Sequence, residues 1–230
     1  MGEGIGNEEL LMPFINSANI ACGYHAGDET TMQQVIELCL KHNVNIGAHP
    51  SFLDRENFGR TEIQLSFSAI YELVKDQLTL INKIALHCAG KLHHVKPHGA
   101  LYNMAAKDAT LAKTIAQAVK DFDASLIYYG LSGSVMITEA THLGLQTANE
   151  VFADRTYQTD GTLTPRSFSN ALLSNVDDAV KQVIKFIKEN KVVTVTGEEI
   201  IVQADTICIH GDGQHAVDFA KAIYYQLHEK

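Results

Sequence analysis

Residues 17–41 read SANIACGYHAGDETTMQQVIELCLK and decide the fold class, because they hold a strand, a polar turn and a helix in succession. The apolar run 17–22 predicts a buried strand. Asp28 is of a type that caps helix N-termini, and the helix predicted over 29–41 carries its apolar residues on one stripe. A strand that passes through a short turn into an amphipathic helix is the repeating unit of α/β proteins with a parallel sheet.

The same unit recurs along the chain, since short apolar runs alternate with longer segments of helical period. Further strands are predicted over residues 44–48, 93–96, 125–129, 146–151 and 206–210. Further helices are predicted over residues 66–87, 108–120, 132–143, 176–189 and 213–227. Residues 191–203 predict an added antiparallel hairpin. The sequence therefore predicts one α/β domain over residues 1–230.

Composition and charge exclude several classes of protein. With 46% apolar and 20% charged residues among 230, the chain is expected to be soluble and globular, with a core that needs no disulfides. The net charge of −9 argues against a nucleic-acid partner. The four cysteines include no CxxC pair and indicate reduced thiols. The sequence shows no signal peptide and no apolar run long enough for a membrane, so a cytoplasmic protein without a membrane partner is expected.

Polar residues gather where the predicted strands end. Loops after the carboxyl ends of parallel strands converge on one side of the sheet, which is where active sites form in such folds. Five of the six predicted strands lead into His, Asp or Arg residues. The candidates for catalysis are His25, Asp28, His49, Lys96, His98 and His210. The candidates for substrate binding are Arg55, Arg60, Asn103, Asp154, Arg155, Arg166 and Asp212.

These residues also have structural interpretations. Asp28 is expected to cap a helix in any case, and a histidine at a strand end can simply bond a backbone carbonyl. Lys96 is either a cation that stabilises developing negative charge or the partner of a buried carboxylate. Arginines in polar turns favour bidentate binding of a carboxylate or phosphate. The coincidence of four histidines at four strand ends, and the long irregular segment 153–169, favour an active site.

Several common motifs are absent. The sequence holds no Walker A motif, and residues 2–6 lack the preceding strand and the spacing of a dinucleotide fingerprint. It holds no Gly-x-Ser-x-Gly elbow, and Cys22 and Cys208 fall in predicted strands, which disfavours a covalent nucleophile. No local motif predicts a nucleotide site or a metal site, and a bound metal ion stays an open alternative.

Five segments resemble the LamB/YcsF family, the bacterial 5-oxoprolinase A subunits. They are residues 17–28, 46–55, 94–103, 150–155 and 209–213, in the same order along the chain. The resemblance implies a seven-stranded, TIM-like βα barrel of the glycoside hydrolase/deacetylase type. It also implies the opening of 5-oxoproline to glutamate with hydrolysis of ATP as co-substrate. That activity requires the partner subunits B and C, with which ATP is expected to bind.

Roles within such a reaction follow from residue chemistry. Water attack on the lactam needs a base, and the leaving nitrogen needs an acid. The base is expected to be His25, Asp28 or His49. Lys96 and His98 are expected to stabilise the oxyanion or protonate the nitrogen. Arg155 or Arg166 is expected to hold the substrate carboxylate.

The sequence departs from the family at its beginning. Family members carry a strand reading Asp-Leu-Asn-x-Asp before the Gly-Glu pair that matches Gly2 and Glu3, and this sequence starts at Met1, just past that strand. The expectation is therefore a barrel without its first strand, with an open edge beside residues 17–22. An unpaired edge invites association, so a homo-oligomer is compatible with this expectation.

Two other functions remain open at this point. The first is a stand-alone, metal-dependent deacetylase or amidohydrolase, in which His25, His49, His98 and His210 with Asp28 or Asp212 would supply the metal ligands. Pro97 weighs against it, because it interrupts the one His-x-x-x-His spacing in the sequence, His94 to His98. The second is a non-catalytic subunit that positions the active site of a partner.

Overall fold

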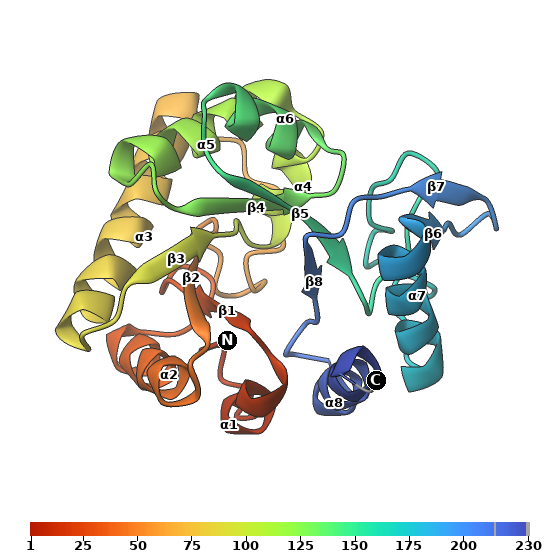
Figure 1. Ribbon diagram of the computed structural model, residues 1–230. Coiled ribbons are helices and arrows are strands. Elements are labelled where there is room, and N and C mark those ends of the chain that lie inside the picture. The colour runs from red at the N-terminus through yellow and green to blue at the C-terminus, as the bar shows by residue number, and fades with distance from the viewer. Residues whose placement is uncertain (214, 229–230) are drawn as a thin grey trace.

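The structure is a computed structural model that describes residues 1–213 and 215–228. Six strands form one sheet in which every pairing is parallel. In spatial order they are β1 (Ser17–Ala21), β2 (Asn45–His49), β3 (Leu92–Val95), β4 (Ile127–Leu131), β5 (Thr147–Phe152) and β8 (Thr206–Cys208). The sheet curls into an open half-barrel, with β1 and β8 as its two edges (Figure 1).

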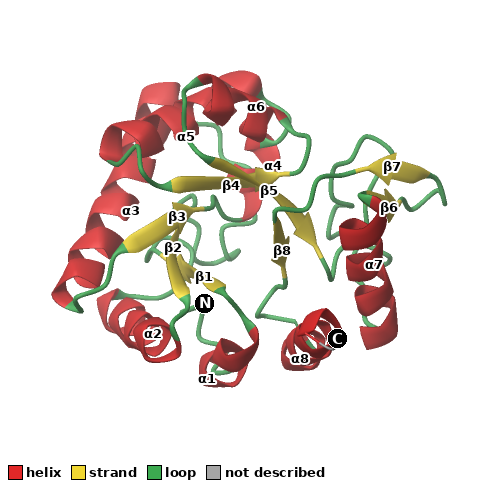
Figure 2. Ribbon diagram, viewed as in Figure 1, coloured by secondary structure: helices red, strands yellow, loops and turns green. Residues whose placement is uncertain are grey.

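Helices cover the outside of this curve (Figure 2). The helices that follow the strands are α2 (Glu29–His42), α3 (Phe67–His87), α4 (Gly99–Ala105), α5 (Ala109–Phe122), α6 (Val135–His142), α7 (Val176–Glu189) and α8 (Ala216–His228). Before β1 come α1 (Glu8–Leu11) and the 3-10 helix η1 (Met12–Phe14), and α1 packs against α8. Strands β6 (Lys191–Val193) and β7 (Glu199–Ile201) form a separate antiparallel hairpin. Within the described residues, no helix combines the length and apolar character needed to cross a bilayer.

The α/β class, the six strands and the hairpin are confirmed. Each observed strand overlaps its predicted range, and helix α7 has the predicted bounds. The helices that were not predicted are α1, η1 and α4, which are too short to show a helical period in the sequence. A seven-stranded barrel and a missing first strand stay predictions, because the described sheet has six strands. The backbone of Met1 lies along the outer edge of β1, where its amino group donates to Asn19 O and its carbonyl accepts from Ala21 N–H.

Local sequence sets the ends of the helices as expected. The Asp28 carboxylate accepts from the backbone N–H of Thr31, which caps α2, and Ser66 caps α3 in the same way. Asn43 ends α2 and Asn190 ends α7, each in the left-handed conformation that asparagine tolerates. The N-caps Asp28 and Ser66 fix where α2 and α3 begin, and so fix where the loops after β1 and β2 end.

Polar side chains fill the interior of the half-barrel both within the strands and at their carboxyl ends. Within the strands, buried His94 from β3 stacks on Tyr129 from β4, and its Nε2 lies 3.0 Å from Asn19 Oδ1 of β1. Gly47 of β2 lies directly against this imidazole, since a Cβ built on Gly47 would sit 2.0 Å from His94 Nε2. Glycine at residue 47 therefore makes the room that His94 occupies. The candidate site lies at the carboxyl ends of the strands.

Replacing Gly47 by alanine tests this packing. We expect Gly47→Ala to lower the free energy of unfolding by about 1–3 kcal/mol, because the methyl group forces His94 out of its place in a dense interior. Urea denaturation with an unchanged m-value measures the effect.

The matched control is Gly211→Ala, where the added methyl group meets Leu11 at an ordinary 3.8 Å and the backbone is not left-handed. We expect the control to change stability by less than about 0.5 kcal/mol. Equal stability of the two variants would contradict the packing described here.

Candidate active site

A cavity of about 960 Å³ opens at the carboxyl ends of the strands and continues along the space between β1 and β8. Residues of β2, β3, β5 and β8, or of the loops that follow them, face it. Among them are His49, Lys96, His98, Glu150, His210 and Arg60. Except for Arg60 they are wholly or largely removed from solvent. Histidines, a lysine and carboxylates from distant parts of the chain therefore meet in one site, as the sequence predicts.

Three of the four strand-end histidines form one cluster. The ring of His25 stacks on that of His98 with centroids 3.8 Å apart, and the His49 ring stands edge-on to His98 at 4.7 Å. All three are buried. His25 lies behind His98 and does not line the cavity, whereas His49 and His98 do. Phe58 packs edge-on against both His25 and His98.

Fixed hydrogen-bond acceptors orient each ring. His49 Nδ1 donates to the carbonyl of Lys96 (2.6 Å), and His98 Nε2 donates to the carbonyl of Phe58 (2.8 Å). The Ser51 hydroxyl donates to Phe52 O and so accepts from His25 Nδ1, 2.9 Å away. Since a carbonyl oxygen can only accept, it determines which nitrogen of a neutral imidazole carries the proton. The remaining nitrogens of His49 and His98 face each other, 2.9 Å apart.

Burial keeps these imidazoles neutral. It lowers the pKa of His49 and of His98 well below the ordinary value, and the neighbouring imidazoles lower both further. His25 has a lowered pKa for the same first reason, although Glu3 opposes the shift. Neutral imidazoles with a free nitrogen are proton acceptors and metal ligands.

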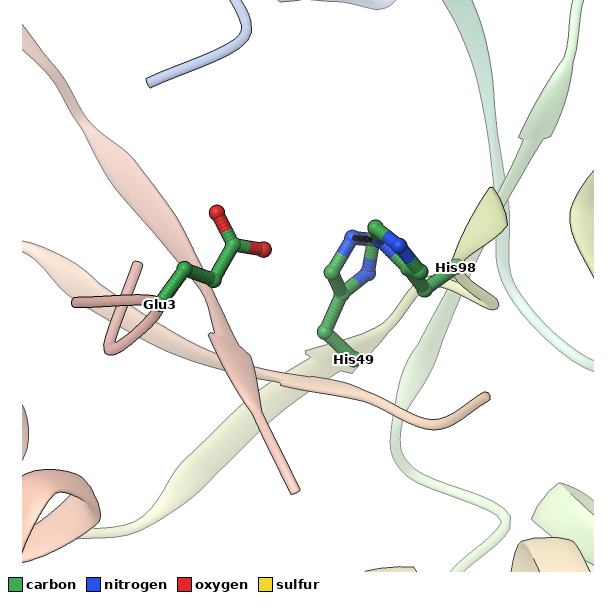
Figure 3. Close-up of side chains that lie close together, drawn as sticks. All are labelled: Glu3, His49 and His98. Atoms are coloured by element: carbon green, nitrogen blue, oxygen red, sulfur yellow. Dashed lines mark hydrogen bonds between the residues drawn. The ribbon is translucent and has the colours of Figure 1, made fainter. Parts of the chain in front are cut away.

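Glu3 completes the cluster and was not predicted. Its Oε1 lies 3.3 Å from His25 Nε2, and its carboxylate turns toward His49 and His98 (Figure 3). Ligand atoms of Glu3, His49 and His98 all lie within 4.8 Å of one another. Burial alone would raise the pKa of Glu3, but the amino terminus and His25 hold it below its ordinary value. Glu3 precedes the first predicted strand, so the strand-end argument could not identify it.

A buried ion pair lies beside the histidines. Lys96 Nζ is 2.6 Å from Glu150 Oε1, and both side chains are almost completely inaccessible. Tyr102 donates to the other carboxylate oxygen at 2.8 Å, and Cys208 Sγ lies 3.1 Å from Lys96 Nζ. Burial alone would lower the pKa of Lys96, but Cys208 and Glu150 hold it above its ordinary value, so the ammonium is charged. The sequence left Lys96 either as a catalytic cation or as the partner of a buried carboxylate; the structure shows the partner, which is Glu150.

The rim of the cavity is formed by the later loops. His210 Nδ1 lies 3.0 Å from the buried carboxylate of Asp154. Burial alone would raise the pKa of Asp154, but His210 and Arg155 lower it to about 2. Arg60 forms an ion pair with Asp212 at 2.5 Å, which joins the loop after β2 to the loop after β8 across the open side of the half-barrel. Asp154 itself lies behind His210 and does not line the cavity.

The other predicted substrate-binding residues divide into two groups. Asn103 and Arg166 are exposed side chains that line the cavity. Arg155 also lines it, but its guanidinium is buried and donates to the carbonyls of Thr164 and Ala171, so it holds the long loop in place.

Two predicted residues lie outside the cavity. Asp28 is exposed at the start of α2 and caps that helix, which is the structural role foreseen for it. Arg55 is exposed and donates to the carbonyls of Gly23 and Gly27, so it stabilises the loop after β1. The structure does not bring these two side chains to the histidine cluster, and their predicted roles in catalysis and substrate binding gain no support from it.

The fold and site define a class: an α/β half-barrel protein with a buried His, Glu and Lys site at the carboxyl ends of its strands. The sequence model of the LamB/YcsF family matches residues 1–230, and the chain belongs to that family. It is 52% identical over 223 residues to the A subunit of 5-oxoprolinase from Shouchella clausii, covering 97% of this chain and 88% of that protein. It is 50% identical to the corresponding A subunit from Oceanobacillus iheyensis, covering 97% and 87%.

A solved structure agrees with this assignment. The crystal structure of a lactam utilization protein from Thermus thermophilus superposes with a TM-score of 0.90 at 37% identity, covering 96% of this chain and 89% of that one. The curled parallel sheet described above is therefore shared with a solved relative over nearly the whole chain.

The Lys96–Glu150 pair yields a stability prediction. We expect Lys96→Met to lower the free energy of unfolding by about 3–5 kcal/mol, because it leaves the Glu150 carboxylate buried without its cation. Urea denaturation measures the loss.

The double variant Lys96→Met/Glu150→Gln is the control. Glutamine keeps an acceptor for Tyr102 but carries no charge, so we expect the double variant to be more stable than Lys96→Met alone. If it is less stable, the cost of Lys96→Met does not arise from an unpaired carboxylate.

Proposed function

We propose that this chain is the A subunit of an ATP-dependent 5-oxoprolinase and hydrolyses the lactam of 5-oxoproline to L-glutamate together with partner subunits. The names of its relatives at about half identity support this function. The observation that carries the chemistry is the orientation of His49: its Nδ1–H is bonded to the Lys96 carbonyl, which leaves Nε2 as a proton acceptor at the cavity.

The proposed reaction has three steps. The lactam oxygen takes the γ-phosphoryl group of ATP, which releases ADP and activates the ring carbon. Water adds to that carbon while a base removes its proton, and the C–N bond then breaks as the nitrogen gains a proton. A second water hydrolyses the resulting acyl phosphate to glutamate and phosphate. One ATP and two water molecules are consumed for each ring that opens.

The geometry narrows the candidates for each role. Asp28 lies outside the cavity, so His25 or His49 is the base, and His49 is the one that faces the cavity. The charged Lys96 stabilises negative charge on the substrate oxygen, since a preorganised buried cation needs no reorganisation during the reaction. His98 lines the cavity next to His49, and its Nδ1, 2.9 Å from His49 Nε2, passes the proton that His49 has taken from water to the leaving nitrogen.

The substrate carboxylate binds at the rim in this proposal. Arg155 is committed to two backbone carbonyls, whereas Arg166 lines the cavity as an exposed side chain. Arg60 is paired with Asp212, and Asn103 is a further polar residue of the cavity lining. Arg166 is therefore the better candidate of the two arginines for the carboxylate.

Subunits B and C are the proposed partners, and ATP is bound with their participation. The word "subunit" in the names of the relatives supports an assembly of more than one chain. The lack of a Walker A motif in this chain fits a nucleotide site that is shared with or located on a partner. A cytoplasmic location stays a prediction.

The direct test measures glutamate released from 5-oxoproline by candidate B and C subunits, with ATP, in the presence and absence of this chain. We expect release only when the chain is present. His49→Ala should lower turnover roughly 10²–10⁴-fold, the usual contribution of a general base. His142→Ala, an exposed histidine on α6, is the matched control and should leave turnover unchanged.

Two outcomes would overturn the proposal. Full turnover with His49→Ala, Lys96→Met and His98→Ala would identify a binding subunit without catalytic residues. Turnover by this chain alone, without ATP or partners, would identify a stand-alone amidohydrolase.

Arg166 yields a separate prediction. We expect Arg166→Gln to raise the KM for 5-oxoproline roughly 10–100-fold with little change in kcat, because a charge-assisted hydrogen bond contributes about 1.5–3 kcal/mol to binding. Steady-state kinetics of the assembled enzyme give both constants. An unchanged KM would place the substrate carboxylate elsewhere.

A further inference from the structure

The hydrogen bonds around His49 and His98 leave two nitrogen lone pairs facing each other, with no proton or cation between them. The carbonyls of Lys96 and Phe58 require His49 Nδ1 and His98 Nε2 to be protonated. In neutral rings, His49 Nε2 and His98 Nδ1 then both carry lone pairs, and these nitrogens lie only 2.9 Å apart. Two lone pairs at this distance repel, so a proton or a metal ion must lie between or beside them.

The surroundings favour a metal ion over a proton. Both rings are buried, and burial opposes the charge of an imidazolium ion. The Glu3 carboxylate lies next to the two rings, with an oxygen within 4.8 Å of both facing nitrogens. The two nitrogen lone pairs and the carboxylate together form a ligand set for a divalent cation, and the carboxylate offsets part of the charge of that cation.

We propose that Glu3, His49 and His98 bind one divalent transition-metal ion of the zinc type. Two imidazoles and one carboxylate form a common set of three protein ligands for zinc. The outer nitrogens donate to backbone carbonyls, which is how metal-binding histidines are usually oriented. The cluster faces the cavity, which leaves an open coordination position for water or substrate. With the ion bound, the lone pair of His49 Nε2 is a ligand, so His49 acts as the proposed base only in the metal-free chain.

The geometry requires only a small adjustment. Zinc–nitrogen bonds of about 2.0–2.1 Å at tetrahedral angles separate two ligand nitrogens by roughly 3.3 Å. The two nitrogens are 2.9 Å apart, so the rings must move apart by a few tenths of an ångström. The Glu3 carboxylate, within 4.8 Å, must approach by a change of side-chain rotamer. His25 assists by stacking on His98, which holds that ring in position.

Metal uptake by the whole chain tests this inference without any activity assay. The protein is stripped with a chelator and titrated with CoCl₂, because cobalt(II) takes the same ligands as zinc and reports its coordination in the visible spectrum. We expect one Co²⁺ per chain, absorption bands of a four- or five-coordinate site without a thiolate band, and displacement by ZnCl₂. Glu3→Gln and His49→Ala should each weaken binding roughly 100-fold or more.

Control variants keep the experiment decisive. His210→Asn changes another histidine of the same cavity that is bonded to Asp154 and not to the cluster, and it should bind Co²⁺ as the unmodified chain does. Glu3→Gln is nearly isosteric, and a far-UV circular dichroism spectrum equal to that of the unmodified chain shows that it is folded.

Three results would overturn the inference. They are uptake well below one Co²⁺ per chain, uptake that Glu3→Gln and His49→Ala do not change, or a thiolate absorption band. Because the readout is metal binding, it is independent of the proposed 5-oxoprolinase activity. A chain that binds one Co²⁺ at these residues but fails in the glutamate assay would keep the metal site and lose the proposed function.

Discussion

The hydrogen bond from His49 Nδ1 to the carbonyl of Lys96 is the contact on which the site depends. It joins the end of β2 to the end of β3 at 2.6 Å, between two buried residues. A buried carbonyl must be paired, and an imidazole that pairs with it is fixed in orientation and tautomer. Because Nδ1 is held by this bond, His49 Nε2 faces His98. The side chain of Lys96 pairs with Glu150.

Polar groups can fill the inside of this half-barrel because most of them have a partner. Burying an unpaired amide, hydroxyl or charge costs several kcal/mol, so the interior is organised as closed pairs. His94 is paired with Asn19, Lys96 with Glu150, and Asp154 with His210. Each pair links different strands, so the sheet holds its curvature through side chains as well as through its backbone ladder. The small residue Gly47 belongs to the same arrangement, since it gives His94 its space.

The sequence predicted the strands and long helices better than the side-chain contacts between them. Strands and long helices follow from hydrophobic period and capping, which are local properties. The gathering of His49, His98 and His210 follows from a general rule about strand ends. Glu3 and Glu150 could not be found in this way, because their importance depends on which side chains face them. Asp28 shows the reverse: its local role as a cap was correctly predicted, and that role keeps it out of the cavity.

One cavity holds a charged lysine, Lys96, beside two neutral histidines, His49 and His98. Glu150 holds Lys96 in its charged form, while burial and mutual repulsion keep His49 and His98 uncharged. Groups whose environments push their pKa values apart can act as base and as electrostatic stabiliser at the same pH. A cation held by Glu3, His49 and His98 would lie beside Lys96, and the two positive centres together would attract an oxygen that gains negative charge as a lactam opens. Glu150 holds the charged Lys96 in place, and Glu3 would do the same for the proposed cation.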